Sequence, residues 1–145
     1  MIRPKGFTLV EIMIVVAIVA LLAAISIPNL LRARHNANET KAITVIRTVS
    51  TACESFRAAQ TPPTYPPNLI ALVTAIPPYV SDLITNAVDA ASARQGYFYT
   101  YTFVNTIQYT CTATPAIVGT TGTRVFFVDE SGVIRIGGSL GPTIE

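Results

Sequence analysis

The chain contains few of the residues from which catalytic and metal sites are built. Its 145 residues include one histidine, His35, two cysteines, Cys53 and Cys111, and no tryptophan. A metal site needs several ligands, and a Ser-His-Asp triad needs a histidine oriented by a third group. The sequence therefore predicts no catalytic residues, no metal and no cofactor. His35 lies beside Arg32 and Arg34 and is interpreted as a solvated side chain.

Charged side chains are also scarce, at 12% of the residues, against about a quarter in an average soluble protein. The formal net charge of +2 comes from Arg3 and Lys5, since the other residues include eight basic and eight acidic side chains. Affinity for nucleic acid depends largely on neutralising phosphates, so no nucleic-acid partner is expected. A surface without net charge suits a subunit that packs against many copies of itself.

The main feature of the sequence is one long apolar segment, residues 7–27. As a helix it is about 31 Å long, close to the hydrocarbon thickness of a bilayer. It has no GxxxG motif, but small residues such as Ala17, Ala20 and Ala24 allow close helix approach. Glu11 lies near its start, and a charged side chain at the bilayer centre costs roughly 2.5–3.5 kcal/mol. Glu11 therefore needs a shallow position or a partner.

Cleavage of the chain after Gly6 would supply that partner. Phe7 would then carry a free α-amino group, with a usual pKa of about 8, roughly one helical turn from Glu11. A conventional secretory signal peptide is the alternative interpretation of this segment. It is disfavoured because Glu11 interrupts the apolar run and no small-x-small cleavage site leads into a polar sequence.

The segment Gly6-Phe7-Thr8-Leu9-Val10-Glu11, behind the short basic leader, closely resembles the N-terminus of type IV pilins and type II secretion pseudopilins. The resemblance covers about residues 5–31. It implies that a prepilin peptidase cleaves between Gly6 and Phe7 and N-methylates Phe7, and that Glu11, Thr8 and Pro28 act in filament assembly. It also implies residence in the bacterial inner membrane before assembly, and afterwards in a cell-surface pilus or a periplasmic pseudopilus.

We expect one long helix that continues to about Gln60. Pro28 removes a helical hydrogen bond and predicts a kink, because residues 30–59 again have a helical pattern. Beyond residue 32, apolar residues recur at spacings of 4, 3, 4 and 3 and predict a covered face: Ala42, Ile46, Val49, Cys53 and Phe56. Glu39 and Ser50 are assigned to the exposed surface. The predicted domains are a leader at 1–6, a transmembrane and assembly helix at 7–31, and a head at 32–145.

The rest of the head is predicted to be an antiparallel sheet packed on the helix, which gives an α+β fold. A proline-rich connector precedes a short helix that Asn68 caps and that runs through Ala75, and a further helical turn is expected within 81–93. Four strands are predicted at 97–104, 107–114, 124–129 and 133–136. The first strand is predicted to carry Tyr97, Tyr99, Tyr101 and Phe103 on one face, and the second to carry Ile107, Tyr109, Cys111 and Ala113 on its inward face.

Two features of the head allow more than one interpretation. Cys53 and Cys111 are both predicted to lie between helix and sheet, so a disulfide is expected, with two buried free thiols as the alternative. Asp129-Glu130-Ser131-Gly132 is interpreted as a hairpin turn. A calcium loop is the alternative, but an oxygen cage for calcium needs six to eight ligands.

The functional prediction is a structural, non-enzymatic subunit of a type IV filament. Its expected partners are other copies of itself, the prepilin peptidase and the pilus or secretion assembly machinery. The absence of an acidic calcium loop favours a type IVa pilin over a type II secretion pseudopilin. A less favoured alternative, from another class, is a single-pass membrane-anchored binding module whose N-terminus is never processed.

Overall fold

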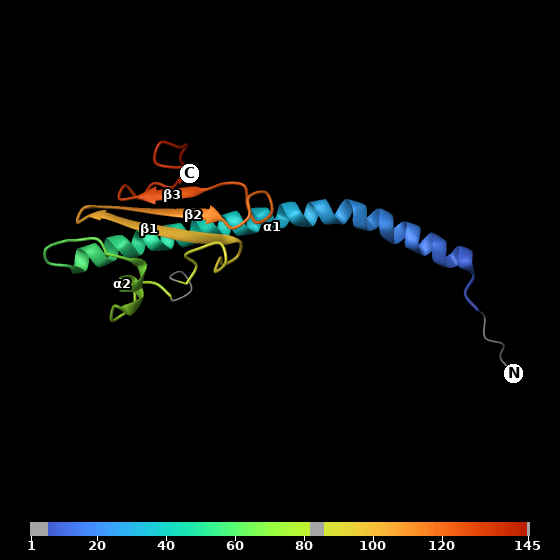
Figure 1. Cartoon of the computed structure of the whole chain (residues 1–145), viewed down its shortest axis with the longest axis horizontal. Coiled ribbons are helices and arrows are strands. Elements are labelled where there is room, and N and C mark those ends of the chain that lie inside the picture. Colours follow the sequence, from blue (N-terminus) through green and yellow to red (C-terminus); the bar gives the residue numbers. More distant parts are fainter. Residues whose placement is uncertain (1–5, 82–85, 145) are drawn as a thin grey trace. The chain divides into compact units, whose positions relative to one another are not determined.

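The structure is a computed structural model that describes residues 6–81 and 86–144. Two helices and four strands are present in these residues (Figure 1). The chain divides into two compact units, Met1–Arg34 and His35–Glu145, which we describe separately. The elements are α1 (Leu9–Ala59), α2 (Leu69–Thr74), β1 (Tyr97–Asn105), β2 (Gln108–Pro115), β3 (Phe126–Asp129) and β4 (Arg135–Ile136).

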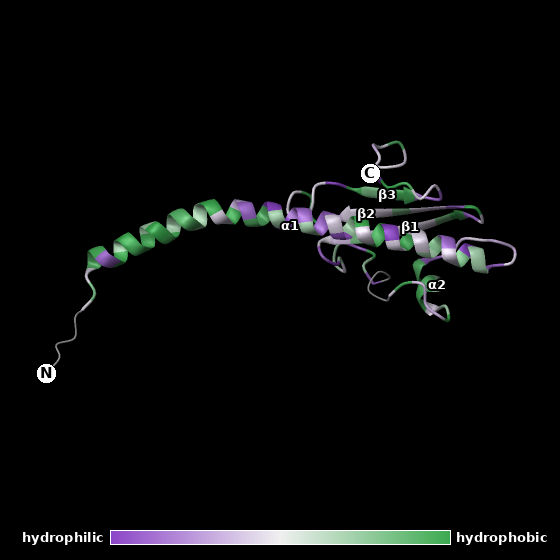
Figure 2. Ribbon diagram, turned by 180° about the vertical axis from the view of Figure 1, so that it is seen from behind, coloured by the Kyte–Doolittle hydropathy of each residue, from purple (hydrophilic) through white to green (hydrophobic). Residues whose placement is uncertain are grey.

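The first unit consists mainly of the N-terminal part of α1. Every large apolar side chain from Leu9 to Leu31 is exposed, and Figure 2 shows this part of the helix as almost uniformly hydrophobic. By length and composition the helix can cross a membrane. Because it is apolar on all sides, this part of the helix needs lipid or another protein surface to cover it. The helix continues through Pro28, so the prediction of one long helix is confirmed, and the kink stays a prediction.

The second unit contains a four-stranded sheet in the order β1-β2-β3-β4, and all three strand pairs are antiparallel. This confirms the predicted α+β meander. Strands β3 and β4 each begin two residues later than predicted. For β3 the reason is that the amide of Arg124 donates to the carboxylate of Glu39, on α1, instead of to a neighbouring strand.

The core of the head lies between α1 and one face of the sheet. The predicted helix stripe is confirmed, with Ile46, Val49 and Cys53 fully buried and Phe56 partly buried against the same cluster. The sheet contributes alternate residues, as the period of a strand requires: Tyr97, Tyr99, Tyr109, Cys111, Ala113, Phe126 and Val128.

One inward position, Ile107, was predicted wrongly, since it is 58% exposed. Phe103, predicted on the same face of its strand as Tyr97 and Tyr99, is 38% exposed, whereas those two are buried. A register irregularity between Phe103 and Asn105 ends the regular alternation of β1, and Ile107 lies in the turn before β2. Ser50 is buried, contrary to prediction, and its Oγ accepts a hydrogen bond from the hydroxyl of Tyr109 at 3.0 Å.

The connection between α1 and the sheet agrees in part with prediction. The side chain of Asn68 accepts a hydrogen bond from the amide of Ala71 at 2.9 Å, which confirms the predicted cap of α2. Residues 86–93 form turns and bends in place of the predicted helical turn, and residues 82–85 of that prediction lie outside the described residues.

Candidate functional site

The N-terminus of α1 is closed by a reciprocal pair of side chains, Thr8 and Glu11. The amide of Glu11 donates to Oγ1 of Thr8 at 3.2 Å. In return, the amide and the hydroxyl of Thr8 donate to Oε2 of Glu11 at 3.4 and 3.3 Å. This is the capping-box arrangement, in which two backbone donors at a helix start are satisfied by the helix itself.

Through the capping box, Thr8 is a hydrogen-bond partner of Glu11 that was not predicted from the sequence. The pattern Thr-x-x-Glu before an apolar run is a known sign of a helix start, so the signal was present in the sequence. The carboxylate thus accepts two hydrogen bonds inside its own chain. At 3.3–3.4 Å, both exceed the usual lengths for such bonds, so a stronger donor could displace them.

Gly6 and Phe7 precede the helix in irregular backbone and are both exposed. A Cβ atom at Gly6 would meet no atom within 4 Å, so the fold itself does not require glycine there.

Pro28, the third predicted assembly residue besides Thr8 and Glu11, lies 20 residues beyond Thr8 in the same helix. At 1.5 Å per residue this is about 30 Å along the axis. The structure thus brings Thr8 and Glu11 together and leaves Pro28 apart from them.

Cys53 and Cys111 are both buried free thiols. Burial raises the pKa of each thiol to about 12, which keeps both protonated at neutral pH. The predicted disulfide is not formed in the structure, where the two thiols pack as small apolar residues, the alternative interpretation.

His35 is partly buried, whereas the sequence analysis expected it to be solvated. Its Nε2 atom is shielded from solvent and has no hydrogen-bond partner within residues 6–81 and 86–144. No group of three or more His, Cys, Asp or Glu side chains that could hold a metal occurs in this described part of the chain.

The segment from Asp129 to Gly132 is a hairpin turn, as predicted. Oδ1 of Asp129 accepts from the amide and the hydroxyl of Ser131, and Oδ2 pairs with Arg135 at 3.0 Å. Burial raises the pKa of Asp129, but these hydrogen bonds and the nearby positive charge outweigh that effect and lower it overall. Both carboxylate oxygens are thus already engaged by the protein.

A buried carboxylate in the head, Glu39, was wrongly assigned to the surface. It is 4% exposed and accepts from the amide and the hydroxyl of Thr123, each at 2.9 Å. It also pairs with the guanidinium of Arg124, with Oε2 2.6 Å from Nη2. Burial raises the pKa of Glu39, but these contacts more than offset it and hold the pKa below its usual value. They attach the loop before β3 to α1.

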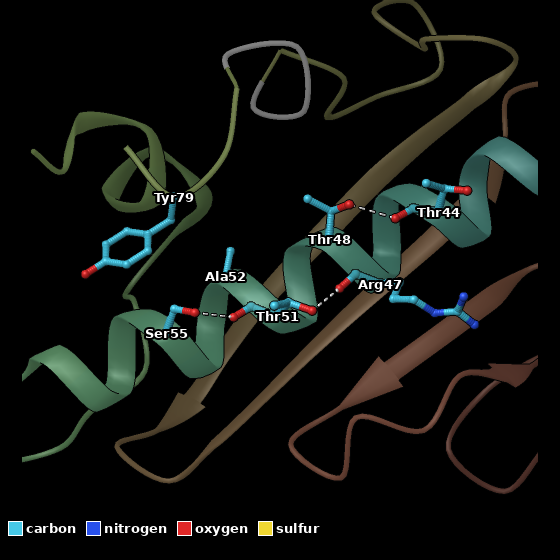
Figure 3. A pocket seen from close by; sticks show the side chains of 7 residues that line it. All are labelled: Thr44, Arg47, Thr48, Thr51, Ala52, Ser55 and Tyr79. Atoms are coloured by element: carbon cyan, nitrogen blue, oxygen red, sulfur yellow. Dashed lines mark hydrogen bonds between the residues drawn. The ribbon is translucent and has the colours of Figure 1, made fainter. Parts of the chain in front are cut away.

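A groove of about 300 Å³ follows α1 in the head (Figure 3). The hydroxyls of Thr48, Thr51 and Ser55 each donate to the carbonyl four residues earlier, at 2.9–3.0 Å. The described residues of its lining include no carboxylate, histidine or cysteine. The lining residues are Thr44, Arg47, Thr48, Thr51, Ala52, Ser55 and Tyr79.

Parts of this chain are similar in sequence to known proteins. Residues 1–27 match the family model of the prokaryotic N-terminal methylation motif. The chain is 67% identical over 36 residues, 25% of its length, to the type IV wide pilus major component PilA4 of Thermus thermophilus. It is 46% identical over 54 residues, 37% of its length, to the type IV major pilin protein PilA of Myxococcus xanthus.

A third relative belongs to a different machine. The chain is 39% identical over 73 residues, half of its length, to the type II secretion system core protein G of Vibrio cholerae. The matches span 28%, 24% and 50% of the lengths of these three relatives. The chain therefore carries the prokaryotic N-terminal methylation motif, has the α+β fold expected of a pilin, and is homologous over part of its length to type IV pilins and type II secretion core G proteins.

Proposed function

We propose that this protein is a structural subunit of a type IV filament and polymerises through the N-terminal half of α1. The observation that carries the proposal is that every large apolar side chain from Leu9 to Leu31 is exposed. Such a surface is stable in a bilayer or in a bundle of like helices and unstable in water. A subunit that moves from membrane to filament meets both environments.

Processing is the first step of the proposed mechanism. A prepilin peptidase cleaves the exposed Gly6–Phe7 bond and methylates the new amine of Phe7. The bond lies in irregular backbone before the capped helix, so cleavage need not unwind α1. The methylated amine stays cationic and can attract a carboxylate.

Assembly then exchanges the partner of Glu11. In a free subunit the carboxylate accepts the long hydrogen bonds from Thr8. In the filament it pairs with the Phe7 ammonium of a neighbouring copy, a charged and stronger donor. Because an unpaired carboxylate among apolar helices is costly, the pair selects the axial position of each incoming subunit. Pro28 remains a proposed assembly residue as a point of weakened helical hydrogen bonding.

Within this class we favour a type IVa pilin. Asp129, the central carboxylate of the turn that could have formed a calcium loop, is already held by Ser131 and Arg135. The second candidate is a type II secretion pseudopilin, which is supported by the match to a core G protein over half of the chain.

Mass spectrometry of the mature N-terminus tests the proposal. The expected N-terminal residue is methylated Phe7, in protein recovered both from membranes and from filaments. An intact Met1 in the wild-type protein would support the unprocessed membrane-anchored module and contradict filament assembly by this route. A Gly6→Ala variant should accumulate uncleaved in the membrane with its head folded, since a Cβ atom at Gly6 has space around it.

A further inference from the structure

Two arginines, Arg32 and Arg34, follow directly after the apolar part of α1 and have no part in the proposed assembly mechanism. Both residues are exposed. None of the ion pairs within residues 6–81 and 86–144 involves either of them. Figure 2 shows that α1 changes along its length from almost uniformly hydrophobic to mixed. The two guanidinium groups thus lie at the end of the apolar part and are not paired with a carboxylate from the described part of the chain.

The sequence around the arginines contains no carboxylate that could neutralise them. No acidic residue occurs between Glu11 and Glu39. Glu39 is buried, and its carboxylate is already held by Thr123 and Arg124. We therefore expect an anion from another molecule to pair with the arginines.

The position of Arg32 along α1 matches one face of a bilayer. Arg32 follows Glu11 by 21 residues in one continuous helix, and no residue between them is charged. At 1.5 Å per residue the two are about 32 Å apart along the axis, close to the hydrocarbon thickness of about 30 Å. When the guanidinium of Arg32 lies at the phosphates of one leaflet, Glu11 lies at the hydrocarbon border of the other leaflet. A charge there costs less than at the bilayer centre.

Arg32 and Arg34 point to opposite sides of the helix. Residues two positions apart are separated by about 160° around the axis of an α-helix, so one neighbouring protein surface cannot cover both. Lipid headgroups surround a membrane helix on every side. A second copy beside this one in the membrane has the same residues at the same depth, and therefore no carboxylate at the level of the arginines. Both arguments favour lipid headgroups over a second copy as the partner.

We propose that Arg32 and Arg34 bind the phosphodiester groups of anionic phospholipids in the leaflet at the C-terminal end of the span. A guanidinium donates two parallel hydrogen bonds to phosphate oxygens, and the apolar stem of the arginine can lie along the hydrocarbon. Phosphatidylglycerol suits the site better than phosphatidylcholine, because its headgroup brings no positive charge close to the guanidinium.

This contact rests on the membrane stage of the proposed function. It holds the unassembled subunit at one depth, so that Glu11 stays near water until it meets the Phe7 ammonium of a neighbouring copy. The charges at the two ends of the apolar part thus act together: the arginines set the depth of the helix, and the carboxylate is kept accessible for assembly.

The lipid preference of the full chain tests the contact. The chain is reconstituted in phosphatidylcholine vesicles at a density so low that copies rarely meet, with a trace of spin-labelled lipid. Spin-labelled phosphatidylglycerol should be immobilised by the chain about twofold more strongly than spin-labelled phosphatidylcholine, since the signal averages over all lipids around the helix. Arg32→Gln with Arg34→Gln should remove this preference. Arg32→Lys with Arg34→Lys should keep most of it, because the charge remains.

Arg47→Gln is the matched control for the loss of a positive charge. Arg47 is exposed on the same helix, 15 residues beyond Arg32, which is about 22 Å along the axis. The variant should keep the full preference for phosphatidylglycerol. An equal loss in Arg47→Gln and in the double glutamine variant would mean that the overall charge of the chain attracts the lipid, and would overturn the contact.

The other outcomes separate the contact from the function on which it rests. Equal association of the wild-type chain with the two lipids would overturn the contact. A double glutamine variant that keeps the lipid preference but forms no filaments would assign the arginines to an interface between copies, and would overturn it as well. The vesicle measurement needs no filaments, so a wild-type chain that forms none in cells would overturn the proposed function and leave the lipid contact measurable.

Discussion

The two parts of α1 differ in where their apolar side chains lie. From Leu9 to Leu31 all the large ones are exposed, whereas in the head Ile46 and Val49 are fully buried by the same chain. One helix thus contains a part whose apolar face is covered by the sheet and a part whose apolar surface only lipid or another molecule can cover. The comparison shows that the head buries its apolar helix face within the same chain, whereas the apolar part leaves its side chains to be covered by its surroundings.

The strongest test of this difference is Glu11→Ala in the apolar part. The variant should be cleaved and inserted normally, because the segment around Gly6 and Phe7 is unchanged. Filament yield should fall at least about tenfold, since the pair that selects the axial position is gone. Electron microscopy of sheared filaments and blotting of membranes measure the two quantities.

Met13→Ala is the matched control for Glu11→Ala, because Met13 is exposed on the same helix and carries no charge. Normal filament numbers for Glu11→Ala, in cells without the wild-type chain, would contradict the assembly role of the carboxylate.

A smaller effect is expected from Glu39→Ala in the head. The change leaves the Thr123 and Arg124 amides without their acceptor and Arg124 without its partner. Because Arg124 is half-exposed, we expect a loss of about 2–3 kcal/mol in the free energy of unfolding. Urea unfolding of the detergent-solubilised chain, followed by tyrosine fluorescence, measures it.

The lowered pKa of Glu39 predicts that the free energy of unfolding depends on pH. Because this pKa is lower in the folded than in the unfolded protein, the Glu39 carboxylate stabilises the fold above pH 4.5. That stabilisation is lost as the pH falls through the pKa of the folded protein. Glu39→Gln should reduce this dependence and leave the part that is due to Asp129, whose pKa is also lowered. Lys41→Ala, an exposed neighbour, should change stability by less than about 0.5 kcal/mol. A loss of stability in acid that is as large in Glu39→Gln as in the wild type would contradict this assignment.

The smallest expected effect is that of Thr8→Val, which keeps the shape of the side chain and removes the capping hydroxyl. It should destabilise the first turn of α1 by about 1 kcal/mol. Amide hydrogen exchange at residues 9–12 in detergent should become about fivefold faster. Thr40→Val removes a hydroxyl from the middle of α1 and should leave the first turn unchanged. Equal exchange in wild type and Thr8→Val would mean that the capping box does not form.

Local patterns in the sequence predicted most of the fold. The end of α1, the cap of α2 at Asn68 and the four strands follow from periodicity, proline placement and turn chemistry, which act within a few residues. The contact of Glu39 with Arg124 could not be found this way, because the two residues are 85 positions apart and neither has a local signal. The exposure of Phe103 could not be predicted either, because the register irregularity at the end of β1 leaves no mark in the alternation of residue types.

The candidate site stays a prediction from the N-terminal motif, and the hydrogen-bond partner of Glu11 within the chain was missed. Gly6, Phe7 and Glu11 were identified from the N-terminal motif, and residues 1–27 match the methylation-motif model. Thr8 was named as an assembly residue without its physical role. Glu11 was treated only as a charge in lipid, although its spacing from Thr8 also predicts a capping box.

The row of hydroxyls along α1 affects how easily this face of the head can leave water. Thr40, Thr44, Thr48, Thr51 and Ser55 each donate to a carbonyl of their own helix. When another protein surface displaces the water from this face, none of these hydroxyl protons loses an acceptor. The usual penalty for drying a polar surface is therefore small here. The same helix face is suited both to a free subunit surrounded by water and to a subunit packed among its neighbours.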